Sequence, residues 1–328
     1  MLAPTVTFYE QVAANRRNSL LLVFLIAALL ALLGFTIGYG LTGELGGGLF
    51  AIVGALIFAG ALSAGSYLSG DSLVLAASQA REVTEADAPR LLDVVREIAI
   101  AANIPMPRVY VIDDSAPNAF ATGRDPGHAS IAITTGLLEK LDREELQGVI
   151  GHELSHVHNL DIRFTLLVAV LVGSIALLAD FFLRFTFWGG GGRSSSRDRG
   201  GGGGLQLIVL VIAIVLAILA PLFAQLVQLA VSRQREYLAD ASSVELTRNP
   251  YGLQRALAKI AADKEVLEVA NRATQHLYIV NPIKKFEARS AGLLSTHPPI
   301  IDRINRLRSL TGQPPLEGLT SQALAGLD

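Results

Sequence analysis

The chain contains no cysteine among its 328 residues, which excludes disulfide bonds, thiolate nucleophiles and sulfur ligation of a metal. Charge is also scarce, since only 17% of the residues are charged, whereas soluble domains carry about a quarter. The net charge of −2 provides no positive field that would favour nucleic acid as a partner. Any metal in this chain must therefore be held by histidine and carboxylate side chains, which suits zinc in a catalytic site.

Apolar sequence takes the place of charge, because 51% of the residues are hydrophobic. Most of this content lies in four blocks, at residues 19–39, 49–68, 164–182 and 205–231. Each block is near or above the roughly 20 residues that cross a hydrocarbon core of about 30 Å. The fourth block carries Pro221, which predicts a kink or a tilt. We therefore predict an integral membrane protein with four apolar helices in two hairpins.

The pentapeptide His152-Glu153-Leu154-Ser155-His156 carries the chemistry of this chain. It lies in a segment that reads as a helix, where residues four apart share one face. Two imidazoles on one face can bind a single divalent metal, and the glutamate beside the first of them can act as general base. Asp142 and Glu145 have the spacing of a capping box at the start of this helix. The pattern predicts a zinc peptidase site.

A catalytic zinc usually has three protein ligands and one open position. The best candidate for the third ligand is Glu236, which directly follows the fourth apolar block, whereas the His152 helix precedes the third. A membrane hairpin between them returns the chain to the same membrane face, so the two segments can meet. Asp240 follows Glu236 by one helical turn and can fix the tautomer of a liganding histidine.

The polar segments complete an α+β architecture. We expect a helix at residues 91–102 and strands at 108–112, 118–122 and 129–134. The chain then divides into a membrane hairpin (residues 1–70), a first catalytic part (71–163), a second hairpin (164–232) and a second catalytic part (233–328). The second hairpin contains residues 189–204, which are mostly Gly, Ser and Arg and form a flexible loop by composition.

Arginines indicate the orientation in the membrane. Arg16 and Arg17 precede the first block, which favours a cytoplasmic N-terminus under the positive-inside rule. Arg81, Arg163 and Arg233 then fall on the same side. The arginines of the 189–204 loop run against this rule if the third and fourth blocks both cross, and a shallow hairpin is the alternative.

Four motifs together give this chain a resemblance to the M48 family of membrane-bound zinc metalloproteases. The motifs are PNAFATG at 117–123, GHELSH at 151–156, REYLAD at 235–240 and THPP at 296–299. Their order and the four apolar blocks cover nearly the whole chain. The resemblance is strongest to the bacterial heat-shock members, and the CAAX-processing proteases are more distant relatives.

The resemblance implies a membrane endopeptidase with a gluzincin-like, mostly helical catalytic domain on the cytoplasmic side of the bacterial inner membrane. It implies one zinc ion on His152, His156 and Glu236, with Glu153 catalytic and a role in membrane-protein quality control and stress response. His297 and Arg303 match late positions near the cleft, where a donor can stabilise an oxyanion. An edge strand would align the substrate backbone. Its residues are Asn118, Ala119, Phe120, Ala121 and Thr122.

Two other functions remain open from the sequence. One is a dedicated processing protease with a single class of peptide substrate. The other is a non-catalytic membrane scaffold with a structural metal, although a structural site has no need of a base such as Glu153. In each case the partners are proteins or peptides and the lipid bilayer, with no nucleic acid, and the sequence leaves the oligomeric state open.

Overall fold

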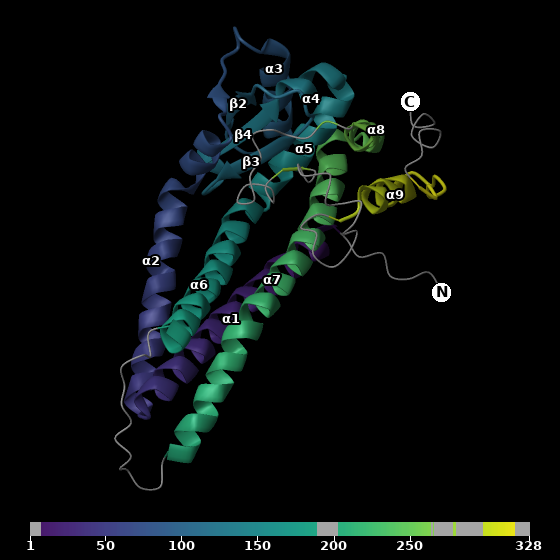
Figure 1. The fold of residues 1–328 in the computed structure, drawn as a ribbon. Helices are drawn as coiled ribbons and strands as arrows, with labels where there is room; N and C mark the ends of the chain where they lie inside the picture. Colours follow the sequence, from purple (N-terminus) through teal and green to yellow (C-terminus); the bar gives the residue numbers. More distant parts are fainter. Residues whose placement is uncertain (1–7, 189–202, 264, 266–277, 280–297, 319–328) are drawn as a thin grey trace. The chain divides into compact units, whose positions relative to one another are not determined.

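The computed structural model describes residues 8–188, 203–263, 265, 278–279 and 298–318 (Figure 1). The chain forms two compact units. The first comprises residues 1–15, 68–164 and 229–328, and the second comprises residues 16–67 and 165–228. The chain leaves the first unit and re-enters it through long helices.

Four long helices carry the apolar blocks. They are α1 (Phe8–Thr42), α2 (Leu45–Ala77), α6 (Asp161–Trp188) and α7 (Gly203–Thr247). Each contains a stretch long and apolar enough to cross a membrane, at residues 20–42, 45–77, 167–186 and 204–227. The prediction of four apolar helices is confirmed. Helix α7 is assigned as one helix through Pro221 and extends well beyond the apolar stretch to Thr247.

The first unit contains a four-stranded mixed sheet with the order β1-β2-β4-β3. The strands are β1 (Arg81–Glu82), β2 (Arg108–Ile112), β3 (Ala119–Gly123) and β4 (Ala129–Thr134). Strands β2 and β4 are parallel, and the other two pairs are antiparallel. The predicted strand at 118–122 is therefore β3, shifted by one residue, and it lies at an edge of the sheet. The sequence pattern did not predict the two-residue strand β1.

Among the described residues, five shorter α-helices and one 3-10 helix (Pro126–His128) belong to the same unit. The α-helices are α3 (Pro89–Ala101), α4 (Thr135–Lys140), α5 (Arg143–His158), α8 (Pro250–Ala262) and α9 (Ile300–Leu310). Helix α5 begins as predicted: the Asp142 side chain accepts the Glu145 N–H at 2.9 Å, and the Glu145 carboxylate accepts the Asp142 N–H at 2.8 Å. This reciprocal cap satisfies two backbone donors at the helix end. It fixes where the metal motif falls on the helix.

Helix α5 lies against α7 and α8 because two of its glycines leave room for close approach. A Cβ atom at Gly148 would meet the Leu253 nitrogen at 2.6 Å, and one at Gly151 would meet the Ser243 Oγ at 2.8 Å. The Ser243 hydroxyl donates to the Gly148 carbonyl at 2.7 Å, which joins α7 to α5. This packing brings the Glu236 region of α7 over the histidine face of α5.

Candidate metal centre

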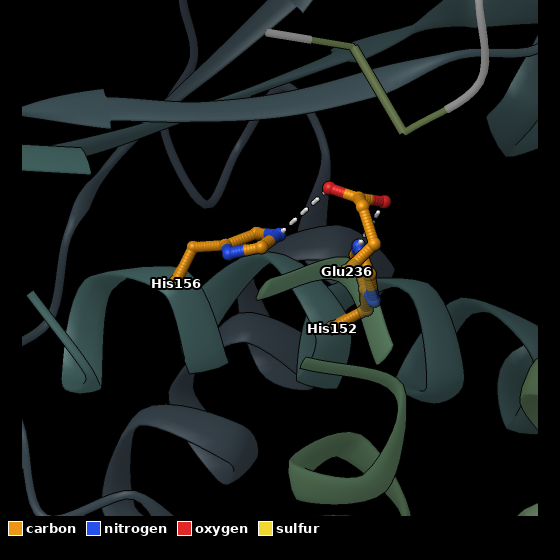
Figure 2. A group of neighbouring side chains, drawn as sticks. All are labelled: His152, His156 and Glu236. Atoms are coloured by element: carbon orange, nitrogen blue, oxygen red, sulfur yellow. Dashed lines mark ion pairs between the residues drawn. The ribbon is translucent and has the colours of Figure 1, made fainter. Parts of the chain in front are cut away.

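The side chains of His152 and His156 project from α5 toward Glu236 on α7, as Figure 2 shows. One ligand atom from each of the three residues lies within 4.8 Å of the other two. The Nε2 atoms of His152 and His156 are 3.6 and 3.5 Å from the Glu236 carboxylate oxygens. The two rings are nearly perpendicular, at 88°. Two imidazole nitrogens and a carboxylate oxygen therefore converge on one point.

His152 contacts a carboxylate through each of its ring nitrogens, Glu236 through Nε2 and Asp240 through Nδ1. Its Nδ1 lies 2.9 Å from Asp240 Oδ1. The Asp240 carboxylate in turn accepts two hydrogen bonds from Arg303, one from Nε at 2.9 Å and one from Nη2 at 2.7 Å. An Nδ1–H donated to Asp240 leaves the Nε2 lone pair of His152 directed at the metal position. The interpretation of Asp240 as the orienting carboxylate rests on this contact.

His156 has an equivalent partner that the sequence analysis missed. Its Nδ1 lies 3.1 Å from Asp161 Oδ2, and Arg235 Nη1 lies 3.1 Å from Asp161 Oδ1. Both Asp161 and Arg235 are buried. The available signal was that Asp161 stands just beyond the motif helix and that Arg235 precedes Glu236 directly.

Glu153 is buried beside the three candidate ligands. Burial raises the pKa of its carboxyl above the usual range, and the positive charge of the two neighbouring histidines partly opposes this rise. The backbone N–H of Ala121 in β3 donates a hydrogen bond to the Glu153 carboxylate. Its Oε1 atom has no hydrogen-bond partner among the residues that the structure describes. A buried carboxylate oxygen of this kind calls for a donor such as water.

Strand β3 follows the site along its open edge. Its Ala119 carbonyl accepts the Ile279 N–H at 2.9 Å, and its Ala119 N–H donates to Asn118 Oδ1 at 3.1 Å. Phe120 stacks edge-on against Tyr278, with ring centroids 5.0 Å apart. The backbone groups of Ala119 that face away from β4 are thus already hydrogen-bonded within the protein. The rest of this edge runs from Ala121 to Gly123.

The remaining candidate residues are His297 and Arg303, and the structure describes only Arg303. His297 lies outside the described residues. Arg303 is fully buried, and besides Asp240 it contacts Glu236 Oε2 at 3.2 Å and the Ile279 carbonyl at 2.8 Å, both through Nη1. Its Nη2 is about equally far from both ring nitrogens of His152, at 3.3 and 3.4 Å. The shorter contact to Asp240 therefore defines the direction of this guanidinium.

The pKa values of His152 and His156 are raised when no metal is bound, so both imidazoles favour the protonated form. Burial lowers the pKa of His156, but hydrogen bonds to Asp161 and Glu236 outweigh it and raise the pKa to about 10. The pKa of His152 is also raised, because its bonds to Asp240 and Glu236 overcome burial and the nearby Arg303 charge. Three carboxylates stabilise the imidazolium forms, and a divalent cation would take the place of those protons.

Two histidines and a glutamate with a buried carboxylate beside them form the donor set of a metallohydrolase. The edge strand β3 lies next to this carboxylate. Fold and site together therefore define a membrane-embedded metallopeptidase.

Comparison with known proteins agrees with this class. The model of "Peptidase family M48" matches residues 85–311. The chain is 45% identical over 303 residues to a "Protease HtpX homolog" of Streptococcus gordonii, covering 92% of this chain and 99% of the relative. It is 47% identical to a homologue of the same name from Streptococcus pyogenes, with the same coverage. Among solved structures, "S. mikatae Ste24p" is similar with a TM-score of 0.41 and 19% identity, covering 75% of this chain and 58% of that one.

The chain belongs to peptidase family M48. It is a multi-pass membrane metalloprotease whose relatives carry the HtpX name, and the resemblance inferred from the four sequence motifs is confirmed.

Proposed function

We propose that this metalloprotease is a zinc endopeptidase of the bacterial cytoplasmic membrane that cleaves misfolded or damaged membrane proteins. The observation that carries the proposal is the convergence of His152, His156 and Glu236 beside the buried Glu153 carboxylate. The edge of β3 lies directly against this carboxylate through Ala121. Metal ligands, base and peptide-binding edge thus meet at one point.

The donor set suits one zinc ion per chain. Two imidazole nitrogens and one carboxylate oxygen are typical of catalytic zinc, which keeps a fourth position for water. When bound, zinc would polarise the scissile carbonyl and lower the pKa of water to about 7. The unsatisfied Oε1 of Glu153 is the acceptor that such a water needs.

Glu153 acts as the general base in this proposal. Its carboxylate takes a proton from the attacking water and delivers it to the leaving amine. The raised pKa of this carboxyl brings it closer to neutral pH, where both halves of that transfer are favourable. The Ala121 N–H holds the carboxylate against β3, and Oε1 is left for the water.

The β3 edge, from Asn118 to Thr122, is proposed to align the substrate backbone by strand addition. Because the Ala119 carbonyl already receives the Ile279 N–H and the Ala121 N–H is bonded to Glu153, pairing with a substrate would use the edge from the Ala121 carbonyl to Gly123. That part lies next to Glu153, so the scissile bond would fall beside the base.

Arg303 has its guanidinium on Asp240 and Glu236, so we propose that it positions these two carboxylates. The oxyanion role inferred for the late His and Arg pair then falls to His297. Arg303 would influence catalysis through the ligands that it holds.

The catalytic unit is proposed to face the cytoplasm. Support comes from Arg16, Arg17, Arg81, Arg163 and Arg233, which flank the apolar stretches on the sides next to the first unit.

The test is proteolysis of casein and of a panel of unfolded membrane proteins by the purified, zinc-loaded chain beside its Glu153→Gln variant. We expect the parent to cut many members of the panel, and we expect the variant to bind equal zinc and cut none. Cleavage of a single peptide class would instead favour a dedicated processing protease. Zinc binding without any cleavage would favour a non-catalytic scaffold, and equal cleavage by both proteins would exclude Glu153 as the base.

A further inference from the structure

The REYLAD segment contributes more to the site than the third ligand. Glu236 supplies a candidate ligand atom, and Asp240, one turn later, bonds His152. Arg235, the first residue of the segment, turns instead to the opposite end of the histidine pair and contacts Asp161. The proposed function gives no role to Arg235 or to Asp161.

Each carboxylate oxygen of Asp161 has its own nitrogen partner. Its Oδ2 faces His156 Nδ1 at 3.1 Å, and its Oδ1 faces Arg235 Nη1 at 3.1 Å. The same Arg235 nitrogen donates to the Asp161 backbone carbonyl at 3.0 Å. The guanidinium carbon of Arg235 lies 3.9 Å from the ring centroid of Phe164, a cation–π contact. Both ions of this pair are buried, with relative exposures of 3% and 5%.

A buried ion pair of this kind is weak evidence for stability alone, because desolvation offsets much of the attraction. Its placement is more informative. The His156–Asp161–Arg235 chain has the same order of groups as the His152–Asp240–Arg303 chain. Each candidate ligand histidine thus has its Nδ1 on a buried aspartate, and each aspartate is held by a buried arginine.

The turn after α5 is what allows Asp161 to reach back. Leu160 has a φ of 59°, in the left-handed region that leucine rarely adopts. Its N–H bonds the Val157 carbonyl at 3.2 Å and closes the end of the helix. Helix α6 then starts at Asp161, so the carboxylate stands at the first position of the new helix and under His156.

We infer that Asp161 and Arg235 form a second orienting pair, which holds His156 in the rotamer and tautomer that present Nε2 to the metal. The inference rests on the proposed metal centre and adds two positioning residues to it. Because Asp161 begins α6 and Arg235 belongs to α7, the pair also joins the ends of the second membrane hairpin directly behind a ligand.

The test compares zinc affinity, measured by competition with a chelator, and the visible spectrum of the Co²⁺-loaded full chain. The variants are Asp161→Asn, Arg235→Lys and His156→Ala, beside the parent. The matched control is Ser243→Ala, which removes another buried hydrogen bond between α7 and α5 without touching a ligand. Thermal unfolding of each metal-free protein records any general loss of stability.

We expect Asp161→Asn to lose about 10- to 100-fold in zinc affinity, as is typical when an outer partner of a ligand is removed. Arg235→Lys, which keeps the charge but not the planar fork, should lose about tenfold. Both should alter the Co²⁺ spectrum, whereas Ser243→Ala should leave affinity and spectrum as in the parent. If Asp161→Asn does not fold, Arg235→Lys carries the same test.

Parent-like affinity and spectrum in the Asp161 and Arg235 variants, with binding lost in His156→Ala, would overturn the positioning role and leave the metal centre intact. A loss of affinity in Ser243→Ala equal to that in Asp161→Asn would also overturn it, because the effect would then be general. Absence of zinc binding in the parent would overturn the proposed metal centre itself.

Discussion

At the scale of single residues, the site is a set of buried charges that a metal would balance. Glu153, Glu236, Asp240 and Asp161 surround two histidines, and two buried arginines offset part of the negative charge. In the metal-free protein the histidines are stabilised as cations by these carboxylates. The electrostatics therefore favour a positive charge at the point where the Nε2 atoms meet.

Zinc binding should release protons. The pKa of His156 is about 10 without metal, so the ring is protonated at neutral pH and must lose its proton before Nε2 can bind. Zinc affinity should then rise about tenfold per pH unit for each proton displaced, up to that pKa. Titration calorimetry in buffers of different ionisation enthalpy counts these protons, and an affinity independent of pH between about 6 and 8 would contradict the expectation.

The Glu153 carboxylate should cost stability in the metal-free protein at high pH. Its folded-state pKa is raised by burial, so the penalty is absent when both states are protonated and appears as pH rises through the raised pKa. Glu153→Gln should therefore raise the unfolding temperature at about pH 8 and leave it unchanged at about pH 4. Glu139→Gln on α4 is the control, since Glu139 is exposed. A gain equal at both pH values would exclude this cause.

Sequence reasoning found the residues whose spacing is local, but it did not predict most of the contacts between residues far apart in the chain. His152, Glu153 and His156 share one helical face, so their proximity follows from helix geometry alone. Glu236 required the further step that a hairpin returns to its starting side. The contacts of Asp161 with Arg235 and of Arg303 with Asp240 join residues 74 and 63 positions apart, and no local pattern encodes which carboxylate each arginine meets.

At the scale of elements, the close packing of α5 determines the site. Gly148 lets α8 approach α5, and Ser243 on α7 bonds the same turn of α5. The helix that carries two of the proposed ligands is thus held directly by the helix that carries the third. The close approach at Gly148 leaves no room for a side chain larger than hydrogen.

Gly148→Ala should destabilise the metal-free protein. The added Cβ would meet the Leu253 backbone nitrogen at 2.6 Å, and overpacking of this kind costs about 1–3 kcal/mol. Gly173→Ala on α6 is the matched control, because a Cβ there meets no described atom within 4 Å and alanine favours the helix by about 1 kcal/mol. Thermal unfolding should move in opposite directions for the two variants, and an unchanged Gly148→Ala would show that α8 can shift without cost.

The strand boundaries were predictable where side-chain pattern and turn residues agree. Strands β2 and β4 match the predicted ranges 108–112 and 129–134, and β3 is shifted by one residue because the pairing with β4 continues to Gly123. Strand β1 has only two residues, both exposed, and exists through its pairing with β2. A segment of this length has no periodicity to recognise.

At the scale of the whole molecule, the chain interleaves a catalytic unit with two pairs of apolar helices. The first unit is assembled from segments on both sides of each hairpin. Composition predicted the apolar helices because their length and polarity suffice, whereas the sheet order β1-β2-β4-β3 needs tertiary contacts. The proposed orientation places the first unit in the cytoplasm.

Orientation can be tested by labelling, because the chain has no cysteine of its own. A cysteine at Ser309, exposed on α9, should react with an impermeant maleimide only after the membrane is opened. A cysteine at Glu44, in the exposed turn between α1 and α2, should react in intact cells. The reverse pattern would place the catalytic unit outside.

In the proposed mechanism, one zinc ion is held by His152, His156 and Glu236 while Glu153 performs the chemistry. The direct measurement is the zinc content per chain, with casein cleavage in the same preparations, for the parent, Glu153→Gln and Glu236→Gln. We predict one zinc in the parent and in Glu153→Gln, with cleavage only in the parent, and loss of both zinc and cleavage in Glu236→Gln. Full zinc content and full cleavage in Glu236→Gln would contradict the account.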